Sequence, residues 1–248
     1  MAAYASQLNS NQSNSNAEVC KVCKSKDCLI HNHSATLLED ASVQSTIIRC
    51  KKGQQFIIEG APVNGLFFIK KGTVKVFRTG INGREQIVRF AKDCEIIGHR
   101  GFGTQEYYSI GAIAIQDIEL YYFSKEDLQK KLLENPKFSY DMMLFYANEL
   151  NRSESKVKSI SQMTVRERVI DTLLYIHRKF GDLRGFINLP LSRKEYADYA
   201  GTTEEQVIRM FSALKKEGLI TAKGKKIAIN NIKSLKNEIS EHNYFLDA

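Results

Sequence analysis

The chain lacks the features that would place it in a membrane or give it an enzyme's chemistry. Its 248 residues contain no apolar run close to the ~18 residues of a membrane-spanning helix. The Ser- and Asn-rich start, residues 1–16, lacks the basic-then-apolar order of a secretory signal. The sequence has no Walker loop, no zincin motif and no paired nucleophile and base. We therefore expect a cytoplasmic protein that contacts no membrane and is not an enzyme.

Acidic residues are also fewer than basic residues. The 36 Lys and Arg residues exceed the 28 Asp and Glu residues and give a net charge of +8, which is compatible with a nucleic-acid partner. The length and the 43% of hydrophobic residues suffice for two modest domains with real cores. The five cysteines of a cytoplasmic protein are expected to be reduced thiols or metal ligands rather than disulfides.

Residues 191–218, LSRKEYADYAGTTEEQVIRMFSALKKEG, predict two short helices joined by a tight turn. A capping box of the form S-x-x-E begins the first helix at Ser192. Gly201 is suited to end that helix in the left-handed conformation, and Thr202 or Thr203 then caps the second. This arrangement is a helix-turn-helix, whose second helix enters the DNA major groove.

The second predicted helix has one buried face. Four apolar side chains recur there at helical spacing: Val207, Met210, Phe211 and Leu214. Residues 219–229, LITAKGKKIAI, then predict a hairpin of the kind called a wing. The alternative is an ordinary helical hairpin inside a core. The charge favours DNA, because residues 203–236 hold eight Lys or Arg against three Glu, a balance that suits phosphate contacts.

Residues 46–124 follow a different pattern. Short apolar runs such as QQFIIEG and GLFFIKKG are separated by glycines, with turns every ~8–12 residues. Residues 79–83, TGING, are expected to join TVKVF and EQIVRF as a hairpin. The pattern predicts an antiparallel roll or jelly roll.

Residues 136–161 change to a helical period and predict one helix roughly 35–40 Å long. Met143, Leu150 and Val157 lie seven residues apart and form a narrow apolar seam, which is typical of a helix that pairs with a copy of itself. Packing of the helix on its own roll is the alternative. Glu154 lies on or beside the seam and would weaken a simple zipper.

A glycine-punctuated roll, a long helix and a winged helix, in this order, resemble the CRP/FNR superfamily of bacterial transcription regulators. The resemblance covers about residues 36–240 and is most specific at residues 51–77, 95–98 and 201–220. It implies an α+β fold with an N-terminal antiparallel β-roll (jelly roll), a long dimerisation helix and a C-terminal winged helix-turn-helix. The implied domains are a mobile N-terminal arm with the cysteines (1–35), a β-roll sensor domain (36–125), a dimerisation helix (126–163) and a winged-helix DNA-binding domain (164–248).

The resemblance also implies roles for side chains of the second helix. Glu205 matches the family's base-reading glutamate, which accepts from cytosine N4, and Arg209 matches the arginine that binds guanine O6 and N7. Ile208 stands where serine is usual. It cannot donate a hydrogen bond but can contact a thymine methyl, so we expect an operator unlike the family's commonest one. Gln206 is suited to adenine. The remaining expected DNA contacts, mainly to phosphate, are Ser192, Thr202, Thr203 and Lys215.

The implied partners are double-stranded DNA, RNA polymerase and a second copy of the chain. A homodimer would place its two recognition helices in successive major grooves, ~34 Å apart, over an inverted-repeat operator. A signal is expected to change the packing of the long helices and so the spacing of the recognition helices.

The effector site of the roll departs from that of the cyclic-AMP-binding members. Glu95 matches their ribose-binding glutamate, although a hydrogen-bonded turn residue is the alternative, and Cys94 replaces the preceding glycine. Glu106 and Tyr107 stand where an Arg-Ser pair would grip the cyclic phosphate, and a carboxylate repels a phosphate. We therefore expect no tight binding of cyclic AMP in the usual mode. The effector-pocket residues assigned from the sequence are Glu95, His99 and Arg100.

A cysteine cluster with the spacing C-x2-C-x4-C precedes the roll: Cys20, Cys23 and Cys28. Thiolates at this density bind iron–sulfur clusters or soft metals, and the motif resembles the N-terminal cluster of the oxygen-sensing FNR members. The FNR members have a fourth cysteine in the roll, but in this chain Glu119 stands at about that position. Cys94 or Cys50 would therefore have to supply the fourth ligand. Two alternatives are open: His33 completes a set suited to zinc, or the thiols bind no metal.

The sequence thus predicts a homodimeric, sequence-specific DNA-binding transcription regulator of the CRP/FNR type. Two other classes are alternatives. One is a cysteine-based redox or metal-binding sensor or storage protein. The other is a cyclic-nucleotide-binding regulatory module of an enzyme or channel, which would not need the winged helix.

Overall fold

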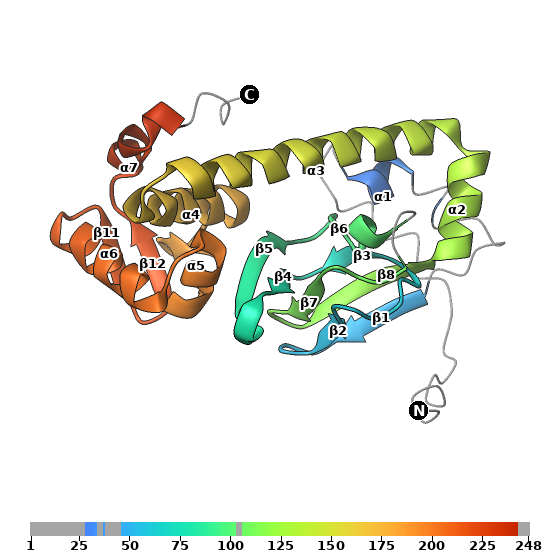
Figure 1. Cartoon of the computed structure of the whole chain (residues 1–248), viewed down its shortest axis with the longest axis horizontal. Helices are drawn as coiled ribbons and strands as arrows, with labels where there is room; N and C mark the ends of the chain where they lie inside the picture. The colour runs from blue at the N-terminus through green and yellow to red at the C-terminus, as the bar shows by residue number, and fades with distance from the viewer. Residues whose placement is uncertain (1–27, 34–36, 38–45, 103–105, 243–248) are drawn as a thin grey trace. The chain divides into compact units, whose positions relative to one another are not determined.

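The computed structural model describes residues 28–33, 37, 46–102 and 106–242 (Figure 1). They form two compact units. Residues up to Val74, with 91–108 and 112–142, make up the first, and residues 75–90, 109–111 and 143 onward make up the second. No helix among the described residues is long and apolar enough to cross a membrane.

The predicted antiparallel roll is confirmed as two four-stranded sheets. The first sheet has the order β1 (Thr46–Cys50), β8 (Ile118–Ser124), β3 (Gly65–Lys71) and β6 (Ile96–Ile97). The second has the order β2 (Gln55–Ile57), β7 (Gly111–Ala114), β4 (Val74–Thr79) and β5 (Glu85–Ala91). The expected TGING loop joins β4 and β5 through a short 3-10 turn, η3 (Ile81–Gly83).

The core of the first sheet lies along β3, an inner strand between β8 and β6, whose first five residues are all buried. Phe68 of β3 and Phe123 of β8 meet edge to face, with ring centroids 5.3 Å apart. Gly65 begins β3 where a Cβ atom would lie 2.1 Å from the Phe123 carbonyl oxygen, so only glycine permits this close approach of the two strands.

The helix expected over residues 136–161 is confirmed as α3 (Pro136–Gln162). A separate helix, α2 (Lys125–Glu134), precedes it within the stretch 126–163. Asn135 separates them and caps α3 by accepting a hydrogen bond from the Phe138 amide at 2.8 Å. Pro136 takes the first helical position, where its missing N–H costs nothing. The 27 residues of α3 make it ~40 Å long.

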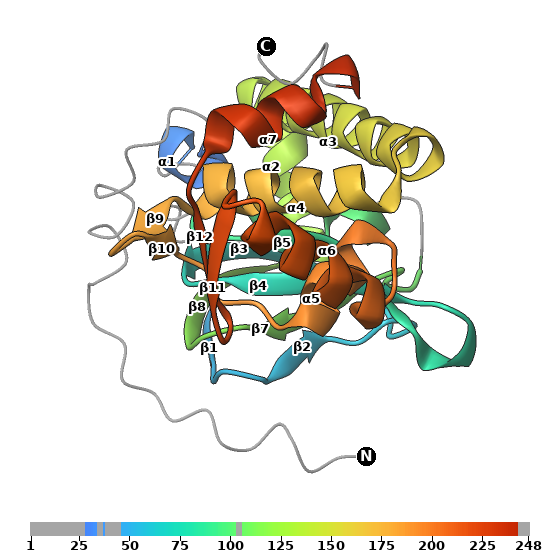
Figure 2. The ribbon, with the colours of Figure 1, turned by 90° about the vertical axis from the view of Figure 1, so that its left-hand side faces the viewer.

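The C-terminal part is the predicted winged helix (Figure 2). Its helices and strands are α4 (Val165–Phe180), β9 (Asp182–Leu183), β10 (Phe186–Ile187), α5 (Arg193–Ala200), α6 (Glu204–Lys216), β11 (Ile220–Lys223), β12 (Lys226–Ile229) and α7 (Ile232–Glu238), followed by the 3-10 turn η5 (Ser240–His242). Arg166 of α4 holds the ends of α6 and α7 together. It donates to Glu217 at 2.6 and 2.9 Å and also pairs with Glu238.

Candidate nucleic-acid interface

The turn between α5 and α6 has the predicted local chemistry. In the capping box, the Glu195 amide donates to the Ser192 hydroxyl at 3.1 Å and the Ser192 amide donates to the Glu195 carboxylate at 2.7 Å. Gly201 ends α5 in the left-handed region, with φ 66° and ψ 45°, as expected. Of the two threonines that follow, Thr203 is the cap of α6, because its hydroxyl accepts from the Gln206 amide at 3.3 Å.

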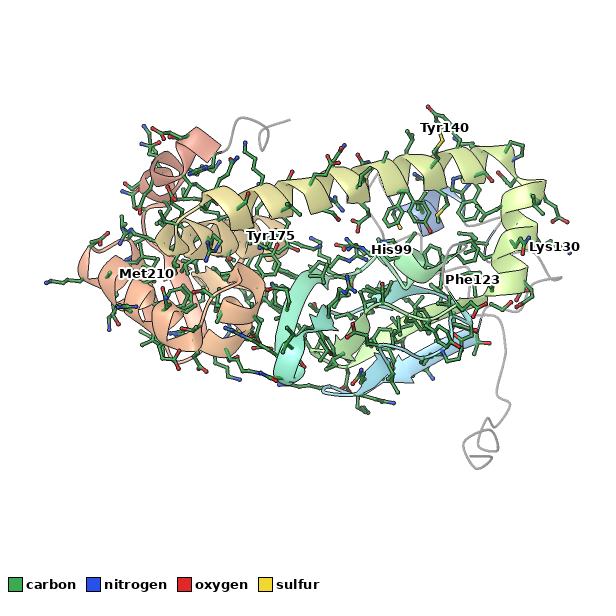
Figure 3. All side chains as sticks on the ribbon, viewed as in Figure 1. His99, Phe123, Lys130, Tyr140, Tyr175 and Met210 are labelled. Carbon is green, nitrogen blue, oxygen red and sulfur yellow. The ribbon has the colours of Figure 1, made fainter. Side chains whose placement is uncertain are left out.

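The buried face of α6 fixes how this helix lies against α5. Val207, Phe211 and Leu214 are at most 3% exposed. The Phe211 ring meets the Tyr196 ring of α5 edge to face at 5.0 Å. Met210, also expected in this stripe, lies at its rim and is half-buried (Figure 3). With one side of α6 held in the core, its opposite side is presented to solvent.

That opposite side, here called the recognition ridge, consists of the exposed residues of α6: Glu204, Glu205, Ile208, Arg209, Ser212, Lys215 and Lys216. Acidic residues lie in its first turn and basic residues in its last turn, which suits the helix dipole. The pKa of the Glu205 carboxyl is lowered because it accepts hydrogen bonds from its own backbone N–H and from the Thr203 hydroxyl. Glu205 is therefore a carboxylate, the form that accepts hydrogen bonds.

The seven residues expected to contact DNA differ in their exposure. Glu205, Arg209 and Lys215 lie on the ridge, and Thr203 is exposed at its beginning. Gln206 and Ser192 are half-buried, and the Ser192 hydroxyl already donates to Glu195 at 2.9 Å. Thr202 is only 9% exposed and offers little surface to a ligand.

The wing is the hairpin of β11 and β12, whose register pairs Lys223 with Lys226 across a two-residue turn. Arg193, which no motif in the sequence singles out, ties this turn to the two helices. It donates to the Gly224 carbonyl at 3.1 Å, and its guanidinium carbon lies 4.5 Å from the centre of the Phe211 ring. The signal in the sequence was an arginine directly after a helix cap, but its partner is 31 residues away.

The expected effector residues lie together on one segment of the roll. Cys94, which replaces the glycine expected there, has φ 73°, a left-handed conformation that glycine adopts without strain. Glu95 and Arg100 are half-buried and His99 is 3% exposed (Figure 3). Glu106 and Tyr107, in the place of the phosphate-binding pair, are both exposed.

The cysteine arm is only partly described, because Cys20 and Cys23 lie outside the described residues. Cys28 is 1% exposed, and Cys50 is buried in β1, where desolvation raises the pKa of its thiol. Glu119, near the position of the family's fourth cysteine, is engaged by Lys70 and Arg49, each at 3.0 Å. These two cations lower the pKa of the Glu119 carboxyl.

His33, the alternative fourth ligand, has another partner in the structure. Its Nε2 lies 2.7 Å from the Asp141 carboxylate of α3, and its ring packs on Phe138 at 5.1 Å. Within the described ranges, no group of three or more His, Cys, Asp or Glu side chains is placed to hold a metal ion. The described residues alone therefore do not make a metal centre, and metal binding by the arm stays a prediction.

An apolar face of α3 is left open to solvent. Met143, Leu150 and Val157, the predicted seam, are 57%, 60% and 67% exposed. Tyr140 is 56% exposed and extends from the same helix into solvent (Figure 3). Large apolar side chains exposed in a row are typical of an interface with another protein.

A helix-turn-helix with an exposed ridge, a basic wing and a preceding β-roll is typical of a class of DNA-binding transcription regulators. Comparison with known protein families supports this assignment. Residues 47–135 match the cyclic nucleotide-binding domain, and residues 167–238 match the Crp-like helix-turn-helix domain.

Relatives and solved structures of the same kind cover most of the chain. Transcriptional activator protein FnrA of Stutzerimonas stutzeri is 26% identical over 215 residues, which are 82% of this chain and 87% of that protein. Transcriptional activator protein anr of Pseudomonas aeruginosa is 29% identical over 183 residues, 72% of this chain and 74% of that one. The structure of FixK2 from Bradyrhizobium japonicum has a TM-score of 0.70 at 25% identity and covers 79% of this chain and 97% of that one. The chain belongs to the CRP/FNR family and is a DNA-binding transcription regulator of this type.

Proposed function

We propose that the recognition ridge reads an inverted-repeat operator, one half-site for each α6 of a homodimer. In this proposal Glu205, Arg209 and Gln206 contact base edges, and Thr203 and Lys215, with Ser192 and Thr202 nearby, contact phosphate. The observation that carries the proposal is the exposure of Arg209 beside an ionised Glu205 on a helix whose other face is held in the core. A forked cation and a carboxylate on one ridge suit guanine and cytosine edges.

The exposed seam of α3 supports the homodimer. Met143, Ala147, Leu150, Glu154, Val157 and Ser161 follow one another at alternating spacings of four and three residues, which is the repeat of a coiled coil. All six are part of α3, and the three largest apolar ones are more than half exposed. A parallel copy of α3 would cover them.

A signal is proposed to enter through the roll or the N-terminal arm and to act on α3. The described contact between His33 and Asp141 supports this route, because it ties the segment directly after Cys28 to α3. The protein would then recruit or block RNA polymerase from its operator by binding rather than by catalysis. A regulator with DNA and RNA polymerase as partners would act in the cytoplasm.

The test is selection of duplexes from a random library by the full chain, in air and under anoxia. We expect enrichment of an inverted repeat whose half-sites lie about 10 bp apart, or one helical turn. Arg209→Ala should lose the preference at one position of each half-site. Enrichment of no sequence by the native chain under either condition would contradict the proposal.

A further inference from the structure

Ile208 is an apolar side chain in the middle of a polar ridge. It is 48% exposed, whereas the neighbouring Val207 is fully buried. Ile208 therefore does not belong to the stripe that packs α6 against the core. The other members of the ridge are charged, except for Ser212, whose hydroxyl donates to the Ile208 carbonyl at 2.9 Å.

The position of Ile208 places it among the residues that would contact bases. Glu205 precedes it by three residues and Ser212 follows it by four, and residues at these spacings share one face of a helix. Arg209 is the next residue and is also exposed. An isoleucine here has no hydrogen-bonding group, so it contributes to DNA recognition only through apolar contact.

The DNA major groove offers one apolar group at the base edges, the C5-methyl of thymine. We propose that Ile208 packs against a thymine methyl and makes the operator require thymine at one position of each half-site. This inference rests on the proposed function of the ridge. It adds a base that neither Glu205 nor Arg209 would select, next to the bases that they contact.

The experiment uses the duplex that the full native chain selects from the random library. Each thymine is replaced in turn by deoxyuridine, which removes the C5-methyl and leaves the hydrogen-bonding edge unchanged. Burial of one methyl group corresponds to about a fourfold change in affinity. We therefore expect deoxyuridine at one position of each half-site to weaken native binding about fourfold per half-site.

Ile208→Ser is the test variant, and Ile232→Ser, the same change at an exposed isoleucine of α7 outside the recognition ridge, is the matched control. Ile208→Ser should bind the thymine and deoxyuridine duplexes equally, while Ile232→Ser should keep the native discrimination. Circular dichroism should show that both variants are folded, since both side chains are exposed to solvent.

Three results would overturn the inference. Discrimination in Ile208→Ser equal to that of the native chain would show that another residue or the DNA shape senses the methyl. Indifference of the native chain to deoxyuridine at every position would exclude a methyl contact while leaving sequence-specific binding intact. If the native chain selected no sequence, the proposed function would itself fail, and this inference with it.

Discussion

Arg209 and Lys215 lie on the same exposed ridge, but their chemistry predicts different effects on DNA binding. The planar fork of Arg209 can bind one guanine edge, whereas the Lys215 ammonium is a point charge suited to phosphate. We expect Arg209→Ala to cost about 1–3 kcal/mol and to relax specificity at one base position. Lys215→Ala should weaken all sequences alike and reduce the salt slope by about one unit.

Fluorescence anisotropy titrations at several salt concentrations, with the selected duplex and a scrambled one, measure both effects. Each variant is the control for the other. Equal loss of affinity for both duplexes in Arg209→Ala would assign this arginine to the phosphate backbone.

Cys94 is a residue whose backbone conformation predicts a stabilising substitution. A φ of 73° costs a non-glycine residue roughly 1–2 kcal/mol of folding free energy. Replacing Cys94 with glycine would remove this cost, but the greater entropy of glycine in the unfolded chain would offset about 0.5–1 kcal/mol of that stabilisation. Cys94→Gly should therefore stabilise the roll by roughly 0.5–1 kcal/mol. Urea unfolding curves measure the change.

Cys94→Ala is the control for this substitution, because it removes the thiol and keeps the Cβ atom. If the alanine variant gained as much stability as the glycine variant, loss of the thiol rather than relief of the backbone would be the cause.

Among the helices, the end of α3 contacts the helix-turn-helix through a half-buried lysine. The Lys156 ammonium lies 3.9 Å from the centre of the Tyr199 ring of α5, and Tyr175 of α4 stacks on that ring at 4.9 Å. Burial lowers the pKa of Lys156 to about 8, with Asp171 opposing this shift and Arg168 adding a smaller contribution to it. The charged form of Lys156 is therefore less favourable in the folded protein than in the unfolded chain.

This shift predicts how the stability depends on pH. Below about pH 8 both states are protonated and the full cost is present. As the pH rises from 8 towards the ordinary lysine pKa of 10.5, the folded state loses its proton first and the cost disappears. Lys156→Met removes the charge and keeps an unbranched chain, but it also loses the contact with the Tyr199 ring. We expect it to stabilise the protein by roughly 1–2 kcal/mol at pH 7.

Urea unfolding of the native chain and Lys156→Met at pH 7 and pH 10 tests this expectation. The difference between the two proteins should shrink at the higher pH. A difference of the same size at both values would show that the charge of Lys156 is not the cause.

The elements that the sequence predicted are those with local signals. The bounds of α5 and α6 follow from Ser192, Gly201 and Thr203, each of which acts on neighbours within a few residues. The helix predicted over residues 136–161 is α3, but the sequence did not separate α2 from it within the stretch 126–163, because Asn135 serves both as the end of α2 and as the cap of α3.

Contacts between distant parts of the chain could not be predicted from such signals. His33 and Asp141 are 108 residues apart, and no periodicity relates them. The contact between Arg193 and the wing turn could not be predicted either, because the register of β11 and β12 decides where the Gly224 carbonyl lies. In the candidate site, the helical period was enough to predict which residues of α6 are exposed. It did not predict which residues from other elements pack against this helix and hold it in place.

For the whole molecule, the proposed homodimer predicts that a charge placed on the exposed seam of α3 keeps the two copies apart. Leu150 is 60% exposed and lies in the middle of the seam. Leu150→Glu would bury a carboxylate in the interface and add to the charge of Glu154, so we expect a monomer. Ser155→Glu adds the same charge to another exposed face of α3 and should leave the dimer intact.

Sedimentation equilibrium measures the mass of both variants. The monomer should also bind the inverted repeat no better than a single half-site, because it presents one α6. A dimer that persists in Leu150→Glu would show that the subunits associate through another surface.

If the exposed face of α6 contacts base edges twice in each assembly, loss of single bases should reveal both contacts. The measurement is missing-base interference on the selected duplex, with the native chain and Arg209→Ala compared on the same DNA. We expect two symmetry-related positions, about 10 bp apart, at which loss of the base weakens binding of the native chain but not of the variant. Identical interference patterns for the two proteins would contradict it.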